Sequence, residues 1–142
     1  MKKTILFLFL LSLTQLEVTK ANFISQRTYH VYIASALPKN IKALKFHCKS
    51  KEDDLGIHKL LSGQSWNFSF HENIIRSTLF YCNFGWGSKQ KTFNVFDDAI
   101  TCIKQAKGDQ TDICYWLVKS NGFYLANVVN PPQWALTKYY NW

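Results

Sequence analysis

Apolar and polar residues alternate along most of the chain with a period of two. In residues 28–34 the residues on one side are Tyr29, Val31 and Ile33, and residues 65–71 alternate in the same way around three aromatic residues. Because successive side chains of a β-strand point to opposite faces, this alternation is typical of a strand with one buried face. The pattern therefore predicts a protein built from half-buried strands.

Such runs recur about every ten residues, and turn signals separate them. Strands are expected near residues 28–37, 43–48, 57–61, 66–70, 78–86, 92–96, 113–118 and 123–125, with a short apolar piece at 100–103. Gly87-Ser88 and Asn121-Gly122 each separate two runs and predict antiparallel hairpins. The aromatic tail after Asn130-Pro131-Pro132 packs back on the domain or forms a final edge strand. We expect an all-β fold, an antiparallel β-sandwich of seven to eight short strands, with a barrel as the alternative.

The first 21 residues follow a different pattern. A basic head, Met1-Lys2-Lys3, precedes a nearly unbroken apolar run at residues 5–13. This is typical of a secretory signal peptide, because a buried core helix does not explain the basic head and a stable membrane span needs about 20 apolar residues. Cleavage near Ala21 leaves residues 22–142 as one secreted, extracellular domain with no transmembrane segment.

The chain is basic, with 17 Lys and Arg against 9 Asp and Glu, a formal net charge of +8. Residues 1–21 hold three lysines and one glutamate, so residues 22–142 keep 14 basic and 8 acidic residues, a net charge of +6. The basic residues are scattered, which favours a generally basic surface over a nucleic-acid-binding arm. A basic secreted defence or membrane-active protein is the alternative function that this charge and the many Trp and Tyr residues suggest.

All four cysteines, Cys48, Cys82, Cys102 and Cys114, follow the expected cleavage site. An even number in a secreted chain predicts two disulfides. A zinc site is the competing interpretation, but no C-x-x-C pair occurs and the four histidines are not clustered. Three pairings are open, and of these we favour the nested one, Cys48 with Cys114 and Cys82 with Cys102.

The acidic residues and histidines form no recognisable catalytic constellation. Asp53-Asp54 and Asp97-Asp98 are adjacent pairs, and neighbouring side chains on an extended chain point apart. No G-x-S-x-G motif and no phosphate-binding glycine loop is present. A hydrolase that depends on His47 or His71 has no further support. We expect no catalytic residues, no metal and no cofactor.

Aromatic residues beside basic ones can also stack on glycans or on single-stranded nucleic acid. The candidates for such a platform are Tyr81, Tyr115 and Tyr124. Because the chain is expected to be secreted, nucleic acid is not its expected partner.

Asn67-Phe68-Ser69 is an N-glycosylation sequon. The alternation that buries Phe68 turns Asn67 outward, where a glycan can be accommodated. We expect Asn67 to be glycosylated, the alternative being an unmodified polar strand residue.

Three motifs follow one another along the chain: H-C-x-S-K-x-D-D-L-G at residues 47–56, F-x-C-x-F-x-W at 80–86 and C-x-W at 114–116. Together with the four cysteines, this order resembles the plant self-incompatibility protein family, the S-protein homologues. Ser35 stands where many members have an Asn. The resemblance implies a small, secreted, disulfide-bonded β-sandwich that acts as an extracellular ligand, with the four cysteines as structural residues and no catalytic residues to transfer.

The most polar segment after the signal sequence, residues 104–112, lies between Cys102 and Cys114. Loops on a rigid sandwich are where binding specificity usually resides. We expect this loop to contact a cell-surface receptor protein, with the chain acting as a monomer, and a second charged turn at residues 49–54 to assist. The expected contact residues are Lys104, Gln105, Lys107, Asp109, Gln110 and Asp112.

Overall fold

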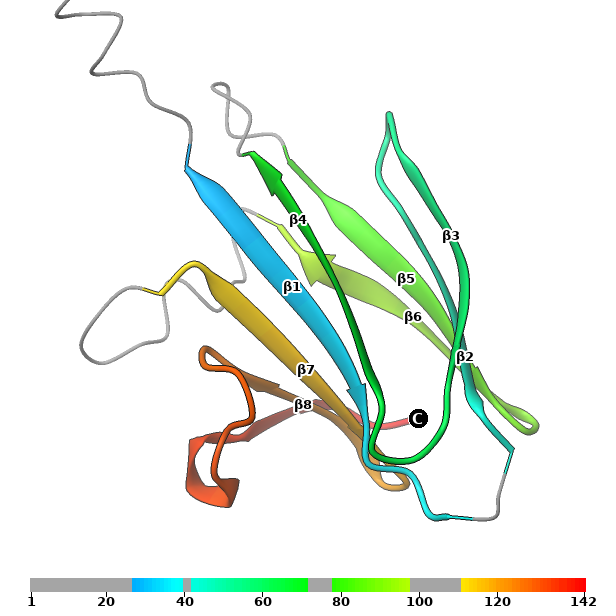
Figure 1. Ribbon diagram of the computed structural model, residues 1–142. Coiled ribbons are helices and arrows are strands. Elements are labelled where there is room, and N and C mark those ends of the chain that lie inside the picture. The colour runs from blue at the N-terminus through cyan, green and yellow to red at the C-terminus, as the bar shows by residue number, and fades with distance from the viewer. Residues whose placement is uncertain (1–26, 40–41, 72–77, 98–110) are drawn as a thin grey trace, which may run out of the picture.

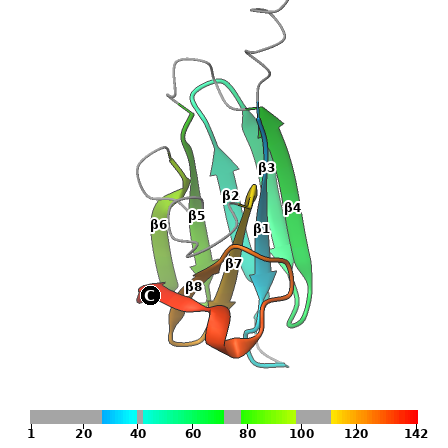
Figure 2. The same cartoon turned by 90° about the vertical axis from the view of Figure 1, so that its left-hand side faces the viewer.

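The computed structural model describes residues 27–39, 42–71, 78–97 and 111–142. Within these ranges the chain forms nine strands in two sheets that pack face to face (Figures 1 and 2). The elements are β1 (Thr28–Ser35), β2 (Leu44–Lys49), β3 (Asp54–Leu60), β4 (Ser65–His71), β5 (Phe80–Trp86), β6 (Lys89–Phe96), β7 (Ile113–Lys119), β8 (Gly122–Ala126), the 3-10 turn η1 (Gln133–Ala135) and β9 (Thr137–Tyr140). The expected signal peptide and the apolar piece at 100–103 lie outside the described residues.

The two sheets confirm the predicted all-β sandwich. The order is β4-β1-β7-β8-β9 in the five-stranded sheet and β3-β2-β5-β6 in the four-stranded one. One pair departs from the predicted antiparallel arrangement, because β1 and β7 run parallel, with His30 opposite Ile113 and Ser35 opposite Val118. A parallel pair needs a long crossover connection, and strands β2 to β6 supply it here. The tail adds β9 as an edge strand, which brings the strands within the described ranges to nine.

Two turns end at earlier residues than predicted. Strand β3 begins at Asp54, so the charged turn is shorter than expected and is closed by the Ser50 amide donating to the Asp53 carbonyl at 2.8 Å. Gly56, expected in the turn, lies inside β3 with φ +80°. The hairpin near Asn121 is confirmed, but Gly122 is already the first residue of β8 and pairs with Lys119.

The inner faces of the two sheets enclose an aromatic core. Phe70 on β4 lies 4.7 Å, ring centre to ring centre, from both Phe80 and Phe96. Trp116 on β7 is fully buried, and its ring centre lies 4.9 Å from that of Phe93. Because ring contacts join side chains of both sheets, this core holds the two sheets of the sandwich together.

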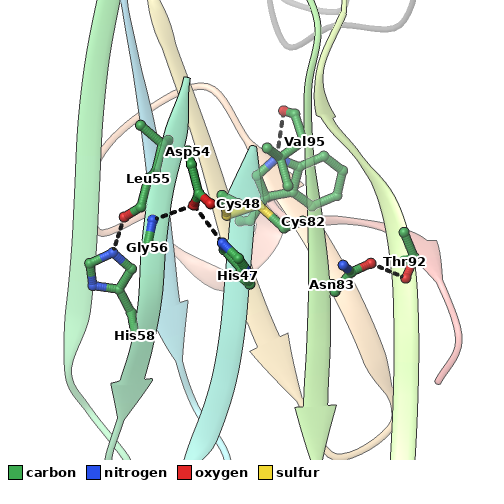
Figure 3. Close-up of a disulfide and its surroundings, with 11 residues drawn as sticks. His47, Cys48, Asp54, Leu55, Gly56, His58, Cys82, Asn83, Thr92 and Val95 are labelled. Carbon is green, nitrogen blue, oxygen red and sulfur yellow. Dashed lines mark hydrogen bonds and ion pairs between the residues drawn. A yellow bond between two sulfur atoms is a disulfide. The ribbon is translucent and has the colours of Figure 1, made fainter. Parts of the chain in front are cut away.

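A disulfide joins Cys48 on β2 to Cys82 on β5 in the four-stranded sheet (Figure 3). The two residues stand directly opposite each other in the antiparallel register. The nested pairing, with Cys48 bonded to Cys114 and Cys82 to Cys102, was therefore wrong, because strand neighbours and not positions along the chain decide which sulfurs meet. Cys114 on β7 is also disulfide-bonded.

A second, smaller apolar cluster lies on the outer face of the five-stranded sheet, where the chain after β8 folds back. Ala34, Tyr115 and Ala126 are buried there, and Leu136 packs against them. Tyr115 is thus covered, and burial raises the pKa of its hydroxyl group. Since Tyr81 belongs to the other sheet, the three tyrosines expected as one stacking platform do not share a surface.

Candidate recognition surface

One end of the sandwich collects the polar segments that the sequence singles out. The charged turn at residues 50–53, the start of β1 and the end of β4 lie at the same end of the sandwich, at the top of Figures 1 and 2, with the turn on the four-stranded sheet and the two strand ends on the five-stranded one. Since β7 runs parallel to β1, its first residue lies at this end of the sheet too. We call this surface, residues 27–28, 50–54, 71 and 111–113, the polar end.

Asp112 at the polar end is attached to β1 by two contacts. Its Oδ1 lies 2.5 Å from Arg27 Nε, and its carbonyl oxygen accepts a hydrogen bond of 2.8 Å from the His30 amide. Both charged side chains are more than a third exposed, so this ion pair adds little stability. The contacts fix where the expected recognition loop rejoins the sheet. The other expected contact residues, Lys104, Gln105, Lys107, Asp109 and Gln110, lie outside the described residues.

Thr111 ties the same point to the end of the neighbouring hairpin. Its hydroxyl group donates a hydrogen bond of 2.5 Å to the Asn127 carbonyl oxygen, one residue beyond β8. Residues 111 and 112 are therefore held from both sides, and the chain enters β7 in a fixed direction.

On the four-stranded sheet, the carboxylate of Asp54 makes the contacts that connect residues of the polar end (Figure 3). Its Oδ1 lies 2.5 Å from His47 Nε2 and accepts a hydrogen bond of 2.9 Å from the Gly56 amide, and its Oδ2 lies 4.0 Å from Lys49 Nζ. The hydrogen bond from His47, followed by that from the Gly56 amide, lowers the pKa of the Asp54 carboxyl group. The ionised carboxylate therefore joins β2 to β3 beside the charged turn.

This cluster was not predicted, because Asp54 belongs to the expected charged turn at residues 49–54 and His47 has no expected partner in the sequence. Their positions in the sequence could have suggested the contact, because His47 and Asp54 flank a short turn between two adjacent strands. A shift in strand register between His47 and Lys49 brings the two side chains together, and sequence alternation does not predict it.

The contacts of the His47–Asp54 pair lie within the fold. The other contacts of the His47–Asp54 pair are with Lys49 and the Gly56 amide, which orient a carboxylate within the fold. In the ranges that the structure describes, no three His, Cys, Asp or Glu side chains converge as a metal site. Likewise, none of the described residues belongs to a helix long and apolar enough to cross a membrane.

Asn67 lies on the outer face of β4, the edge strand of the five-stranded sheet, and is exposed. It stands opposite Tyr32 in the register of β4 with β1. Phe68 points the other way and packs against the core, as the alternation predicts. A glycan on Asn67 has open space on this face, and its presence stays a prediction.

Comparison with known proteins points to one group of plant proteins. The family model described as plant self-incompatibility protein S1 matches residues 30–142. S-protein homolog 5 of Arabidopsis thaliana is 43% identical over 81 residues, which is 56% of this chain and 57% of that protein. S-protein homolog 19 of the same plant is 31% identical over 124 residues, which is 86% of this chain and 87% of that protein.

The matched segments cover only part of several relatives. For S-protein homologs 2 and 3 of Arabidopsis thaliana the alignment spans 51% of each relative's length. A solved structure of an SPH (self-incompatibility protein homologue) protein superposes with a TM-score of 0.53, covering 78% of this chain and 93% of that one at 16% identity. At this identity the superposition supports the sandwich fold.

Proposed function

Because the chain belongs to the plant self-incompatibility protein S1 family, we propose that it is a small secreted ligand that binds a cell-surface receptor protein through its polar end. The receptor contact is made chiefly by residues 104–112, assisted by the charged turn at residues 50–53. The protein acts by binding and not as an enzyme.

Two findings support secretion. The basic head and apolar run at residues 2–13 have the pattern of a signal peptide. The superposed SPH structure comes from what is described as a widespread family of small, highly stable, secreted proteins from plants. Removal of residues 1–21 leaves a domain with a formal net charge of +6, which suits a partner with acidic surface groups.

The observation that carries the receptor-binding proposal is the attachment of Asp112. Its hydrogen bond from the His30 amide and its contact with Arg27 hold one end of the polar segment against a rigid strand. A segment that is held at one end loses less conformational entropy on binding than a free segment does. The polar segment can therefore carry specificity on a scaffold that stays unchanged.

The test exchanges residues 104–110 for the corresponding residues of S-protein homolog 19 and keeps Thr111, Asp112 and all cysteines. Labelled protein is titrated on protoplasts, and saturable, protease-sensitive binding is measured. We expect the exchange to abolish binding or to transfer it to the partner of the donor protein. A control variant with Ser88→Ala and Gln90→Ala, both exposed in the β5–β6 hairpin, should bind as the unaltered protein does. Unchanged partner choice after the exchange contradicts the assignment of the loop.

A further inference from the structure

The segment between β8 and β9 exposes apolar side chains that the fold does not cover. The side chain of Trp134 on η1 is 87% exposed, and Val128 and Val129 are 37% and 40% exposed. In Figure 2 this segment runs down the face turned to the viewer and ends in a turn of helix near the bottom. We call residues 128–135 the aromatic loop.

The aromatic loop is held in one conformation by contacts at several points. Its first neighbour, Asn127, accepts the hydrogen bond from Thr111, and its last neighbour, Leu136, packs into the outer-face cluster. Pro131 and Pro132 restrict the backbone between them. The Ala135 amide donates to the Pro132 carbonyl oxygen at 2.9 Å and forms the turn that carries Trp134.

A lysine holds the loop from the sheet side. Lys119 Nζ donates a hydrogen bond of 3.3 Å to Gln133 Oε1, next to Trp134 in the chain. The same ammonium group lies 4.7 Å from the centre of the Tyr124 ring. Trp134 thus projects from a base that is fixed by a charged hydrogen bond and a cation–π contact.

The stretch of chain that carries the aromatic loop is weakly basic. Residues 113–142 contain two lysines, Lys119 and Lys138, and no aspartate or glutamate. A partner surface that surrounds its apolar contact with carboxylates is therefore complementary in charge to this face.

We propose that the aromatic loop is a second protein-binding site of this ligand, in which Trp134 enters an apolar pocket of a cell-surface protein rimmed by acidic residues. This inference rests on the proposed function, and it places a contact beyond the polar end. Trp is the residue type most enriched among side chains that dominate interface energies, and such residues act from ordered, pre-formed positions.

A lipid surface suits the loop less well than a protein does. Stable membrane attachment takes an apolar anchor together with free basic groups that meet anionic headgroups. The segment that carries the loop, residues 113–142, has two lysines, fewer than the roughly four to eight basic residues of a lipid-binding cluster. A fixed backbone also adds nothing to lipid partitioning, whereas it strengthens binding to a shaped protein pocket.

The experiment compares Trp134→Ala with Ile57→Ala, a control at a residue that is 59% exposed on the other sheet. Saturation binding of labelled mature protein is measured on protoplasts, on protease-treated protoplasts and on vesicles of equal parts phosphatidylcholine and phosphatidylserine. Loss of Trp134 is expected to weaken protease-sensitive binding about 30-fold, the effect of removing a dominant interface residue. The control should stay within about twofold, since scattered exposed apolar residues contribute little. Thermal unfolding of all three proteins confirms that they are folded.

Several outcomes overturn the inference. These are equal binding of Trp134→Ala and the unaltered protein, Trp134-dependent binding to the vesicles or to protease-treated cells, and Trp134-dependent self-association in sedimentation. If the unaltered protein shows no saturable binding to cells, the proposed function fails and the inference fails with it. If exchange of residues 104–110 leaves binding unchanged while Trp134→Ala weakens it, the receptor contact assigned to the polar end is wrong. The binding site proposed at the aromatic loop is then supported.

Discussion

The indole Nε1–H of Trp116 on β7 donates a hydrogen bond of 2.9 Å to the carbonyl oxygen of Val95 on β6. This bond crosses the core from one sheet to the other. Val95 has no register partner on β5, because the pairing shifts between Phe80 and Tyr81. The bulge thus brings a strand carbonyl oxygen to the only polar atom of the Trp116 side chain, and the two buried groups satisfy each other.

We expect Trp116→Phe to lower the free energy of unfolding by about 2–4 kcal/mol, since it leaves a cavity and an unpaired Val95 carbonyl oxygen. Urea denaturation followed by circular dichroism measures the change. Trp134→Phe is the matched control and should stay within about 0.5 kcal/mol, because Trp134 is exposed. Equal losses in the two variants would refute the assigned role of Trp116.

The Cys48–Cys82 disulfide joins residues 34 positions apart in the sequence. Replacing both with alanine is expected to lower the free energy of unfolding by about 2–4 kcal/mol, since the unfolded chain gains entropy. Peptide mapping without reduction should recover Cys48 linked to Cys82. Because Cys114 is disulfide-bonded, we predict Cys102 as its partner. A Cys48–Cys114 peptide would contradict both assignments.

Gly122 begins β8 with φ +143°, and a Cβ atom there would overlap the Tyr140 carbonyl oxygen on β9. We expect Gly122→Ala to lower the free energy of unfolding by about 2 kcal/mol or more, because it adds this overlap to a conformation that L-residues avoid. Gly63→Ala is the control, with φ +83° and no atom within 4 Å of the added Cβ. Gly63→Ala should lower the free energy of unfolding by only about 1 kcal/mol, because the positive φ is unfavourable for alanine but no atom is in the way. Hydrogen exchange of β9 amides should rise in Gly122→Ala only.

Asp54 makes stability depend on pH. Its pKa in the folded protein is lowered from the ordinary 3.8 by the hydrogen bond from His47 and then by the Gly56 amide. The folded state therefore binds fewer protons than the unfolded state in this range, and the stabilising contribution is complete above pH 3.8 and lost as the pH falls through the lowered value. Asp54→Asn should remove this dependence.

Denaturation midpoints measured across the acidic range for the unaltered protein and for Asp54→Asn should converge as the pH falls. Asp53→Asn, in the exposed neighbouring turn, should leave the pH profile of the unaltered protein in place. A constant difference between Asp54→Asn and the unaltered protein at every pH would show that Asp54 acts without its charge.

Asn67 is expected to carry a glycan when the chain passes through a plant secretory pathway. Asn67→Gln and Ser69→Ala each destroy the sequon, and both side chains are exposed. Each variant should lose the glycosidase-sensitive mobility shift of the unaltered protein on a denaturing gel. A shift that persists in Ser69→Ala would place the modification elsewhere.

How far the sequence predicts the fold depends on the range of the interaction. The alternation around Phe68 predicted β4 and its inward face, because side-chain direction along a strand is a local property. The β5–β6 hairpin followed from Gly87 and its neighbours for the same reason. The parallel β1–β7 pair was not predictable, since strand pairing depends on contacts between segments far apart in the chain.

The candidate site divides in the same way. The position of Asn67 on an outward face and the polar character of residues 104–112 follow from the sequence itself. The contacts of Asp112 with Arg27 and of Asp54 with His47 required the register of neighbouring strands. A one-residue change of register would separate such pairs, and the local sequence pattern does not indicate which register two strands adopt.

By itself, the sequence determined a disulfide-bonded all-β domain and its family, because strand periodicity and ordered motifs are properties of the chain read locally. Only the tertiary structure decided that Cys48 meets Cys82, that Trp116 is buried and that Trp134 is exposed. Two tryptophans in one chain have the same intrinsic preference for burial. Which of them is buried depends on where the sheets close over the core and where the chain after β8 folds back.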